Sequence, residues 1–224
     1  MYNRIVAFGC SYVAGDAMPD VWEKNKRNKL KKIKKGKSLI TFPGLIATEL
    51  GLKFVNNGIS GASNKEILEA IENFEFDKDD VVILHWSFVN RTLFRTLDNN
   101  TIQILPSTNP ANWGPVLAKK YYDFQNDMNM LSDTRIFVNY ANYRLKFLGV
   151  RNIINFSPIL GEDARKKITN NIYDFPVDTK HLTYFANTGQ YPDRDLALDQ
   201  KHPGPETHKR FAEYILEEYP WLKE

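Results

Sequence analysis

Three residues near the two ends of the chain have the types and spacing that nucleophilic catalysis needs. Ser11 follows Gly9 and Cys10, directly after the apolar run of residues 5–8. Asp199 and His202 are separated by only two residues, so both can lie on one turn, which Pro203 stiffens. An imidazole can take the proton of a serine hydroxyl, and a carboxylate can orient that imidazole and stabilise its charged form. These residues are therefore candidates for a catalytic triad of Ser11, His202 and Asp199. The competing interpretation is that Ser11 caps the following helix and that Asp199 and His202 lie in a solvated loop.

Acyl transfer also needs hydrogen-bond donors for the oxyanion that forms in the transition state. The backbone N–H groups of Ser11 and Gly61 are the first two candidates, and Gly61 can adopt a positive φ that brings it close to a substrate. An ordinary turn glycine is the competing interpretation of Gly61. Two further candidate donors follow the run of residues 81–84: Ser87, which simple register favours, and Asn90, which a longer loop would favour.

Cys10, Trp86 and Asn64 stand next to the candidate catalytic residues in the sequence. Successive residues at a strand end point in opposite directions, so Cys10 is predicted to pack inward as a small apolar group and not to act as a nucleophile. Trp86 either lines an acyl or sugar pocket or fills the core, and Asn64 is a second candidate for substrate binding. Both are kept as candidate substrate-binding residues.

The remaining histidines are assigned structural or solvent-exposed positions. His85 follows a buried run and is predicted to be a hydrogen-bonded structural residue, whereas His181 and His208 are predicted to face solvent. The spacing of the metal-binding residue types near the C-terminus matches no zinc or calcium signature, and those residues are Asp193, Asp195, His202 and His208. We therefore expect neither a metal nor any other cofactor.

Alternating strands and helices must position these residues. Short apolar runs predict strands at residues 5–8, 53–56, 81–84 and 150–156. Helices are predicted at residues 42–51, 64–74, 113–148 and 206–219; Ser63 and Glu66 form a capping box at the start of the second. This alternation predicts an α/β fold, in which a mainly parallel sheet of about five strands lies between two helical layers. Ligands of such sheets bind beyond the carboxyl ends of the strands, where the candidate residues fall.

Composition and charge limit the classes of protein that this sequence can be. The 224 residues, 42% of them hydrophobic and 25% charged, fit one globular domain spanning residues 1–224. No apolar run is long enough for a membrane span, and the polar N-terminus and single cysteine are typical of a protein synthesised and folded in the cytoplasm.

One lysine-rich run dominates the positive charge. Nine of the cations lie between Lys24 and Lys37, and subtracting them from the net charge of +3 leaves −6 for the rest of the chain. With only Leu30 and Ile33 as large apolar residues, residues 24–37 are predicted to form an exposed insertion. Because it falls at the carboxyl side of the sheet, it is a candidate contact for an anionic partner, whereas general nucleic-acid binding is not favoured.

The order of these blocks resembles that of the SGNH (GDSL-like) hydrolase superfamily. Gly9-Cys10-Ser11 is similar to its first block, with cysteine in place of the usual aspartate; Gly61 stands at its oxyanion glycine, and Asp199-x-x-His202-Pro203 is similar to its last block. The resemblance implies a three-layer, flavodoxin-like α/β/α fold with Ser11 as the nucleophile. The Gly-Cys-Ser and Gly-Ala-Ser-Asn segments are also similar to members found in tailed bacteriophages, for which virion association is one possible location.

The resemblance implies a serine esterase that works through an acyl-serine intermediate. A carbohydrate O-acetylester is the favoured substrate, because the cleft loops contain few apolar residues and the sequence shows no lipid-binding helix. The alternative is a non-catalytic virion or binding protein that retains the fold. Cys10 and the uncertain third donor after residues 81–84 keep that alternative open.

Overall fold

The computed structural model describes residues 2–95, 101–104, 121, 127–156, 195–199 and 201–224. Within them, the main sheet has four parallel strands in the order β4-β1-β5-β8. These strands are β4 (Lys53–Asn56), β1 (Arg4–Gly9), β5 (Asp80–His85) and β8 (Asn152–Phe156). The expected fold class is confirmed, and four of the roughly five expected strands are found in the described part of the chain.

The two central strands are apolar because both of their faces are covered. Every residue of β5 is buried, and so is all of β1 after Arg4. Along β1, Ile5 and Ala7 pack into one core, and Val6 and Phe8 pack into the other. This alternation follows from the two-residue period of side chains along a strand.

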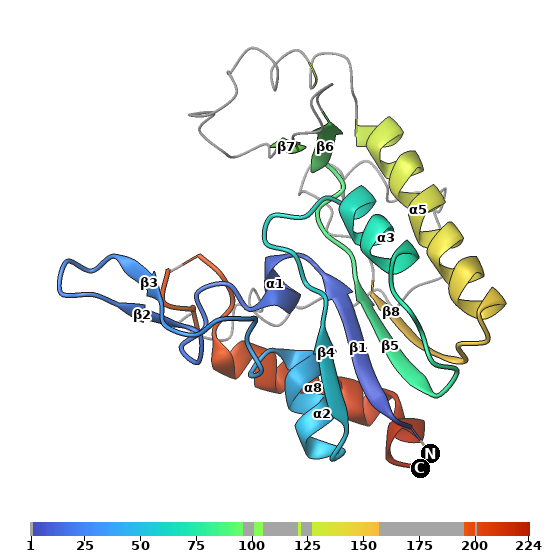
Figure 1. Cartoon of the computed structure of the whole chain (residues 1–224), viewed down its shortest axis with the longest axis horizontal. Coiled ribbons are helices and arrows are strands. Elements are labelled where there is room, and N and C mark those ends of the chain that lie inside the picture. Colours follow the sequence, from blue (N-terminus) through green and yellow to red (C-terminus); the bar gives the residue numbers. More distant parts are fainter. Residues whose placement is uncertain (1, 96–100, 105–120, 122–126, 157–194, 200) are drawn as a thin grey trace.

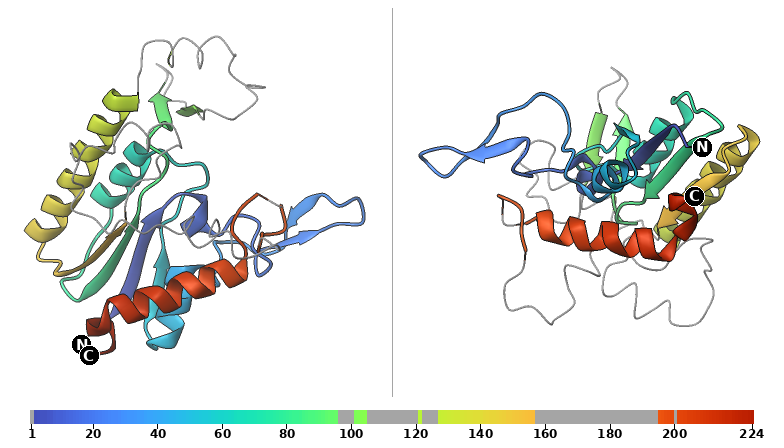
Figure 2. Two further views of the ribbon diagram at one scale, coloured as in Figure 1. Left: turned by 180° about the vertical axis from the view of Figure 1, so that it is seen from behind. Right: turned by 90° about the horizontal axis from the view of Figure 1, so that it is seen from below.

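In the part of the chain that the structure describes, helices cover both faces of the sheet (Figures 1 and 2). The first core contains Phe42 and Ile46 of α2 (Phe42–Glu49) and Phe211 of α8 (Pro205–Glu218). The second contains Ile67 of α3 (Asn64–Glu72) and Leu145 of α5 (Asp127–Phe147). The chain ends in the 3₁₀ helix η1 (Pro220–Lys223), close to the N-terminus. The molecule is therefore a three-layer α/β/α sandwich.

Local sequence signals set the start of α3 as predicted. Ser63 is the N-cap, and its hydroxyl accepts the backbone N–H of Glu66 at 3.3 Å. The Glu66 carboxylate in turn accepts the backbone N–H of Ser63 at 2.8 Å. This reciprocal pair satisfies two donors that the first turn of a helix leaves without partners, and it fixes where the chain enters α3.

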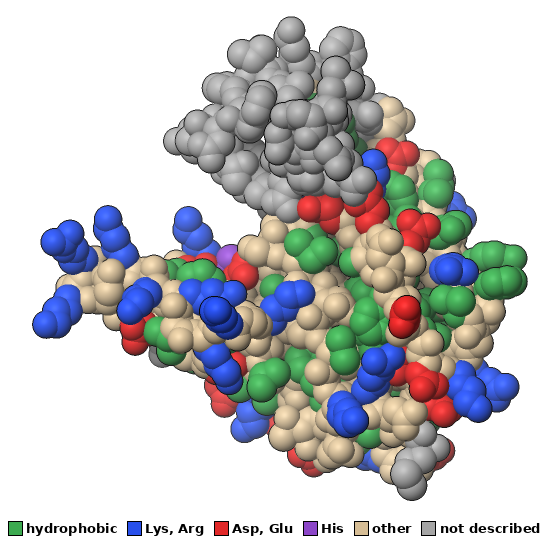
Figure 3. Space-filling model, viewed as in Figure 1, with side chains coloured by type: hydrophobic (Ala, Val, Ile, Leu, Met, Phe, Trp, Pro, Cys, Tyr) green, Lys and Arg blue, Asp and Glu red, His purple; other side chains and the backbone are tan. Residues whose placement is uncertain are grey.

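Two antiparallel hairpins were not predicted from the sequence. One consists of β2 (Trp22–Lys24) and β3 (Leu30–Lys32), and the other of β6 (Thr92–Arg95) and β7 (Thr101–Ile104). The β2–β3 hairpin extends away from the body of the molecule and carries a dense group of cationic side chains (Figures 1 and 3). The lysine-rich run is thus mostly exposed, as expected, but it is ordered by strand pairing.

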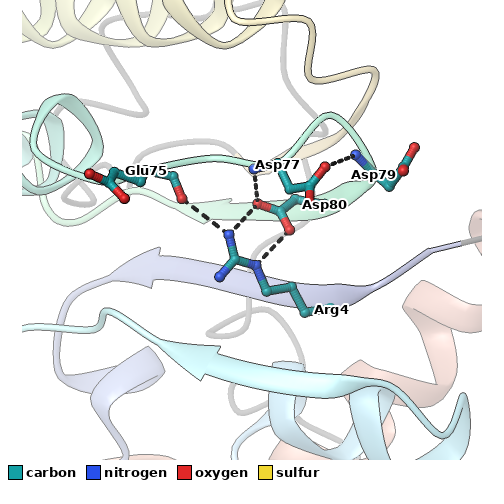
Figure 4. A network of polar contacts seen from close by, with 5 residues as sticks. All are labelled: Arg4, Glu75, Asp77, Asp79 and Asp80. Atoms are coloured by element: carbon teal, nitrogen blue, oxygen red, sulfur yellow. Dashed lines mark hydrogen bonds and ion pairs between the residues drawn. The ribbon is translucent and has the colours of Figure 1, made fainter.

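A partly buried ion pair lies at the amino ends of strands β1 and β5, at the end of the sheet opposite the candidate site (Figure 4). The Arg4 guanidinium donates to both carboxylate oxygens of the fully buried Asp80, at 2.7 and 3.0 Å, and Nη2 also donates to the Glu75 carbonyl at 3.1 Å. The backbone N–H of Asp77 donates to the same carboxylate at 2.8 Å. These bonds join the first residues of β1 and β5 and raise the pKa of Arg4, although its burial acts in the opposite direction.

Parts of the expected middle region lie outside the described residues. They include most of residues 113–126 and nearly all of residues 157–200, with Phe124, His181 and Asp193 among them. None of the helices in the described ranges is long and apolar enough to cross a membrane.

Candidate active site

Ser11 lies where the central strand β1 gives way to a short helix. β1 ends at Gly9, Cys10 is the N-cap, and Ser11 is the first residue of α1 (Ser11–Ala14). The N–H of a first helical residue has no acceptor within its helix, so the N–H of Ser11 suits an oxyanion donor. Cys10 is fully buried in the second core, which confirms its predicted packing role.

The loop after β4 runs beside the end of β1 and carries Gly61 toward Ser11. The backbone N–H of Asn57 donates to the Ala7 carbonyl at 2.7 Å, and that of Ile59 donates to the Gly9 carbonyl at 2.8 Å. Gly61 has a φ of 72°, the left-handed conformation that most side chains disfavour. The glycine is therefore required by the backbone at this position, as the sequence predicted.

Two contacts fix this loop against α1. A Cβ atom on Gly58 would lie only 2.2 Å from the backbone nitrogen of Ala14, so only glycine permits the approach. The Asn56 side chain donates to the Val13 carbonyl at 2.8 Å and accepts the Gly58 N–H at 2.9 Å. No role was predicted for Asn56 from the sequence; its polar side chain at the end of a strand was the available signal.

Asp199 and His202 form a hydrogen-bonded pair. His202 Nδ1 lies 2.5 Å from Asp199 Oδ2, and Asp199 Oδ1 accepts the backbone N–H groups of Lys201 at 2.9 Å and His202 at 3.0 Å. Burial by itself would raise the pKa of Asp199, but these hydrogen bonds outweigh it and lower that pKa. The carboxylate thus stays ionised at neutral pH and holds one ring nitrogen of His202, which leaves Nε2 for chemistry.

Backbone pairing places this turn beside α1. Leu196 and Pro203 form an antiparallel bridge around it, and the Leu198 N–H donates to the Ala17 carbonyl at 3.1 Å. The ring of His202 packs edge-on against the ring of Tyr12, with centroids 5.9 Å apart. Because Tyr12 directly follows Ser11, the structure brings the two halves of the predicted triad to the same edge of the sheet.

Tyr12 is a residue of the site that sequence reasoning missed. Burial, together with the charge of Cys10, raises the pKa of Tyr12 to about 12, although Arg91 acts in the opposite direction. Its hydroxyl therefore stays protonated at neutral pH. An aromatic residue immediately after the nucleophile was the only signal in the sequence, and that signal did not identify its partner.

The loop after β5 is tied to α3 through buried polar groups. The Ser87 N–H donates to Asn64 Oδ1 at 2.7 Å, and Asn64 Nδ2 donates to the Ser87 carbonyl and to Thr134 Oγ1, both at 3.3 Å. Arg91 Nη1 donates to Ser87 Oγ at 3.1 Å. Asn90 is half-buried in the same loop. The choice between Ser87 and Asn90 as third oxyanion donor stays a prediction.

Burial reassigns the two expected substrate-binding residues. Trp86 is fully buried in the second core and donates its indole N–H to Asn155 Oδ1 at 2.7 Å. Asn64 is 2% exposed, with its amide bonded as described above. Both side chains therefore support the loops from inside the protein, and the expectation of substrate contact does not agree with their positions.

His208 is buried, contrary to the expectation that it faces solvent. It is 1% exposed, stacks on Phe42, and accepts the Phe42 backbone N–H at Nδ1, 3.1 Å away. It thereby caps the first turn of α2 from the neighbouring helix α8. Burial, reinforced by the charges of His85 and His202, lowers the pKa of His208 to about 3. His85 is also fully buried, as expected of a structural residue.

The low pKa of His208 predicts acid-sensitive stability. Between the unfolded value of 6.5 and about 3, the unfolded chain binds a proton that the folded chain excludes, so the free energy of unfolding falls as pH falls. Between pH 7 and pH 4, the free energy of unfolding measured by urea denaturation should fall by about 3 kcal/mol less in His208→Gln than in wild type. Glutamine keeps an acceptor for Phe42 but does not titrate, and equal losses in both proteins would contradict this assignment.

Asp195 also has a structural position. Its carboxylate accepts the Thr207 backbone N–H at 2.6 Å, which caps the start of α8 directly after the Asp199–His202 turn. In the part of the chain that the structure describes, no group of three or more His, Cys, Asp or Glu residues is arranged to hold a metal ion.

Comparisons with solved structures agree with this arrangement of strands and loops. A protein assigned to the lipolytic G-D-S-L family from Desulfitobacterium hafniense superimposes with a TM-score of 0.54 at 11% identity, over 95% of this chain and 97% of the other. The fold is that of the SGNH (GDSL-like) hydrolases.

Acetylxylan esterases with the SGNH fold are also similar. One from Geobacillus stearothermophilus has a TM-score of 0.54 at 17% identity, over 97% of this chain and 95% of that one. Another, from Butyrivibrio proteoclasticus, has a TM-score of 0.51 at 14% identity, over 99% of this chain and 65% of that one. No protein-family model matches the sequence, and a search of curated proteins finds no match.

The Geobacillus esterase has been solved as catalytic mutants. In these mutants a serine, an aspartate or a histidine is replaced by alanine, and the aspartate and histidine are three positions apart.

Proposed function

We propose that this protein is a serine ester hydrolase that works through an acyl-Ser11 intermediate. The observation that carries the proposal is the Asp199–His202 pair, bonded at 2.5 Å and packed against Tyr12, the neighbour of Ser11. The side chains of His202 and Asp199 are 26% and 17% exposed, so this pair is open to a substrate. A solvated loop would give neither the short bond nor the contact with α1.

The proposed reaction has two steps of the same kind. Ser11 Oγ attacks the ester carbonyl carbon while His202 Nε2 takes the hydroxyl proton, and the tetrahedral intermediate collapses as His202 returns that proton to the departing alcohol. Water then attacks the acyl-enzyme, again losing its proton to His202, and the acid leaves as Ser11 regains its proton. Asp199 stays ionised throughout and stabilises the imidazolium in each step.

Backbone N–H groups would stabilise the negative oxygen in both steps. The N–H groups of Ser11 and Gly61 are the first two donors, and they belong to adjoining segments at the end of β1. Ser87 is the first choice for the third donor, because a hydroxyl that accepts from Arg91 still has its own proton to donate. Asn90 is the second choice.

A small acyl group on a carbohydrate is the proposed substrate class. The similarity to acetylxylan esterases supports this class. Ser60 and Asp16, whose side chains hydrogen-bond to each other, supply polar groups that could bind a sugar hydroxyl. The proposal covers the reaction type and the substrate class, and it requires no metal or cofactor.

A fluorophosphonate probe tests the reaction type directly. Such probes form a covalent bond only with a serine whose hydroxyl is activated, so we expect one adduct, at Ser11, located by peptide mass spectrometry. Prior unfolding in urea should abolish the reaction, because the base and the oxyanion donors are then separated from Ser11. A folded protein that stays unlabelled would favour the alternative of a non-catalytic binding protein.

A further inference from the structure

A cavity of about 260 Å³ opens between the base of the lysine-rich hairpin and the candidate active site. The loop after α1 and the loop after β4 form one side, through Asp16 and Ser60. The hairpin and the residues that follow it form the other, through Trp22, Lys32 and Lys37. The volume lies below the roughly 300 Å³ at which sites for drug-sized ligands begin, so it suits one sugar unit.

The hairpin side of the cavity combines an aromatic ring with positive charge. Trp22 and Lys32 are cross-strand partners, and side chains of such a pair lie on the same face. Lys32 Nζ lies 5.8 Å from the centre of the Trp22 ring. Desolvation at the cavity wall and the charge of Lys32 lower the pKa of Lys37, although that residue is exposed as a whole. Lys32 and Lys37 thus both line one small space.

The opposite side supplies polar groups next to the nucleophile. Ser60 donates its hydroxyl hydrogen bond to the Asp16 carboxylate, and the Asp16 backbone N–H donates to the Ser11 carbonyl at 3.1 Å. Ser60 directly precedes Gly61, the second candidate oxyanion donor. The cavity is therefore lined by residues of the two loops that adjoin Ser11 and Gly61.

The hairpin holds its side of the cavity in a fixed place. The Ile33 N–H donates to the Val21 carbonyl at 2.8 Å, which continues the strand pairing past β3. Leu30 packs against Ala17 and Met18 in a small core of its own. The strand pairing and the Leu30 contact hold Trp22 and Lys32 in position, so these two residues do not depend on the exposed tip of the hairpin.

We propose that this cavity is a subsite for an anionic sugar unit, and that the ester cleaved at Ser11 is carried by an acidic glycan. The indole ring would contact the apolar face of a sugar ring, Asp16 and Ser60 would bond its hydroxyl groups, and Lys32 and Lys37 would bind its carboxylate or sulfate. The rest of the hairpin would draw the polyanion toward the cleft. The part of this inference that concerns ester cleavage rests on the proposed esterase function, whereas the binding of an anionic sugar does not.

Calorimetric titration of the Ser11→Ala protein with unesterified oligosaccharides separates binding from catalysis. The ligands are tetragalacturonate, a sulfated cellotetraose and neutral cellotetraose, each at the same salt concentration. We expect both anionic ligands, or the one that carries the preferred group, to bind at least tenfold more tightly than the neutral one. Lys32→Gln with Lys37→Gln should remove that preference.

A second pair of lysines provides a control with the same change in net charge. Lys31 and Lys35 are exposed and do not line the cavity, so replacing both with glutamine should weaken anionic binding less than threefold. Equal losses from the two pairs would overturn the subsite in favour of diffuse charge attraction. So would tighter binding of a single-stranded oligonucleotide that depends equally on all four lysines.

Ester turnover by the otherwise wild-type protein distinguishes the subsite from the proposed reaction. Lys32→Gln with Lys37→Gln should leave turnover of p-nitrophenyl acetate within about twofold of wild type, because that ester is too small to span both sites. On acetylated oligogalacturonate, the same variant should lose most of its kcat/KM. Anionic sugar binding without any ester turnover would sustain the subsite and reject the esterase, whereas turnover with no sugar preference would do the reverse.

Discussion

Replacing Ser11 with alanine should lower kcat for p-nitrophenyl acetate by at least about 1,000-fold, because no other group can form the acyl intermediate. Ser11 is buried, but its side chain is small and its hydroxyl makes only a long hydrogen bond to Cys10 Sγ, at 4.0 Å. The free energy of unfolding should therefore change by less than about 1 kcal/mol. Steady-state kinetics and urea denaturation on the same preparation measure the two quantities.

Cys10→Ser is the matched control for Ser11→Ala. It changes the adjacent residue, which is fully buried in the second core. This variant should lose stability, because a buried hydroxyl replaces a thiol, but its folded fraction should retain turnover. If Ser11→Ala kept wild-type turnover while Cys10→Ser lost it, the nucleophile would be the cysteine and the proposed mechanism would be wrong.

His202→Ala should lower kcat/KM by about 1,000-fold or more, because the serine then has no base. Asp199→Asn should also lower kcat/KM strongly: the amide cannot stabilise the imidazolium and favours the wrong tautomer at Nδ1. The double variant should be only slightly worse than His202→Ala, since the two residues act as one unit. Additive losses would indicate that Asp199 acts independently of His202.

The choice of a control histidine depends on the structure. His208→Ala would remove a buried ring that caps α2, so a loss of activity in that variant would report unfolding and not chemistry. His208→Gln keeps the acceptor and is the better control. It should retain turnover at pH 7, and a loss equal to that of His202→Ala, in a protein that remains folded, would contradict the assignment of His202 as the base.

The strands of the main sheet and the start of α3 could be predicted from the sequence, because they depend on local patterns. Apolar runs gave β1, β4, β5 and β8 to within a few residues, and Ser63 with Glu66 gave the start of α3. The β2–β3 hairpin was missed, because its stability comes from an anchor elsewhere. Leu30 packs on Ala17 and Met18, and no composition rule reveals that contact in a lysine-rich run.

The sequence by itself identified the candidate reactive residues, because Asp199 and His202 are close along the chain, and it identified Gly61 as a residue that can adopt a left-handed backbone. Only the tertiary structure decided what surrounds them. Burial gives His208 and Trp86 structural roles, and the pairing of β2 with β3 places Lys32 in the wall of the cavity. The physical reason is that burial and charge proximity depend on contacts between distant segments, whereas turns, caps and strand patterns depend on neighbours in the chain.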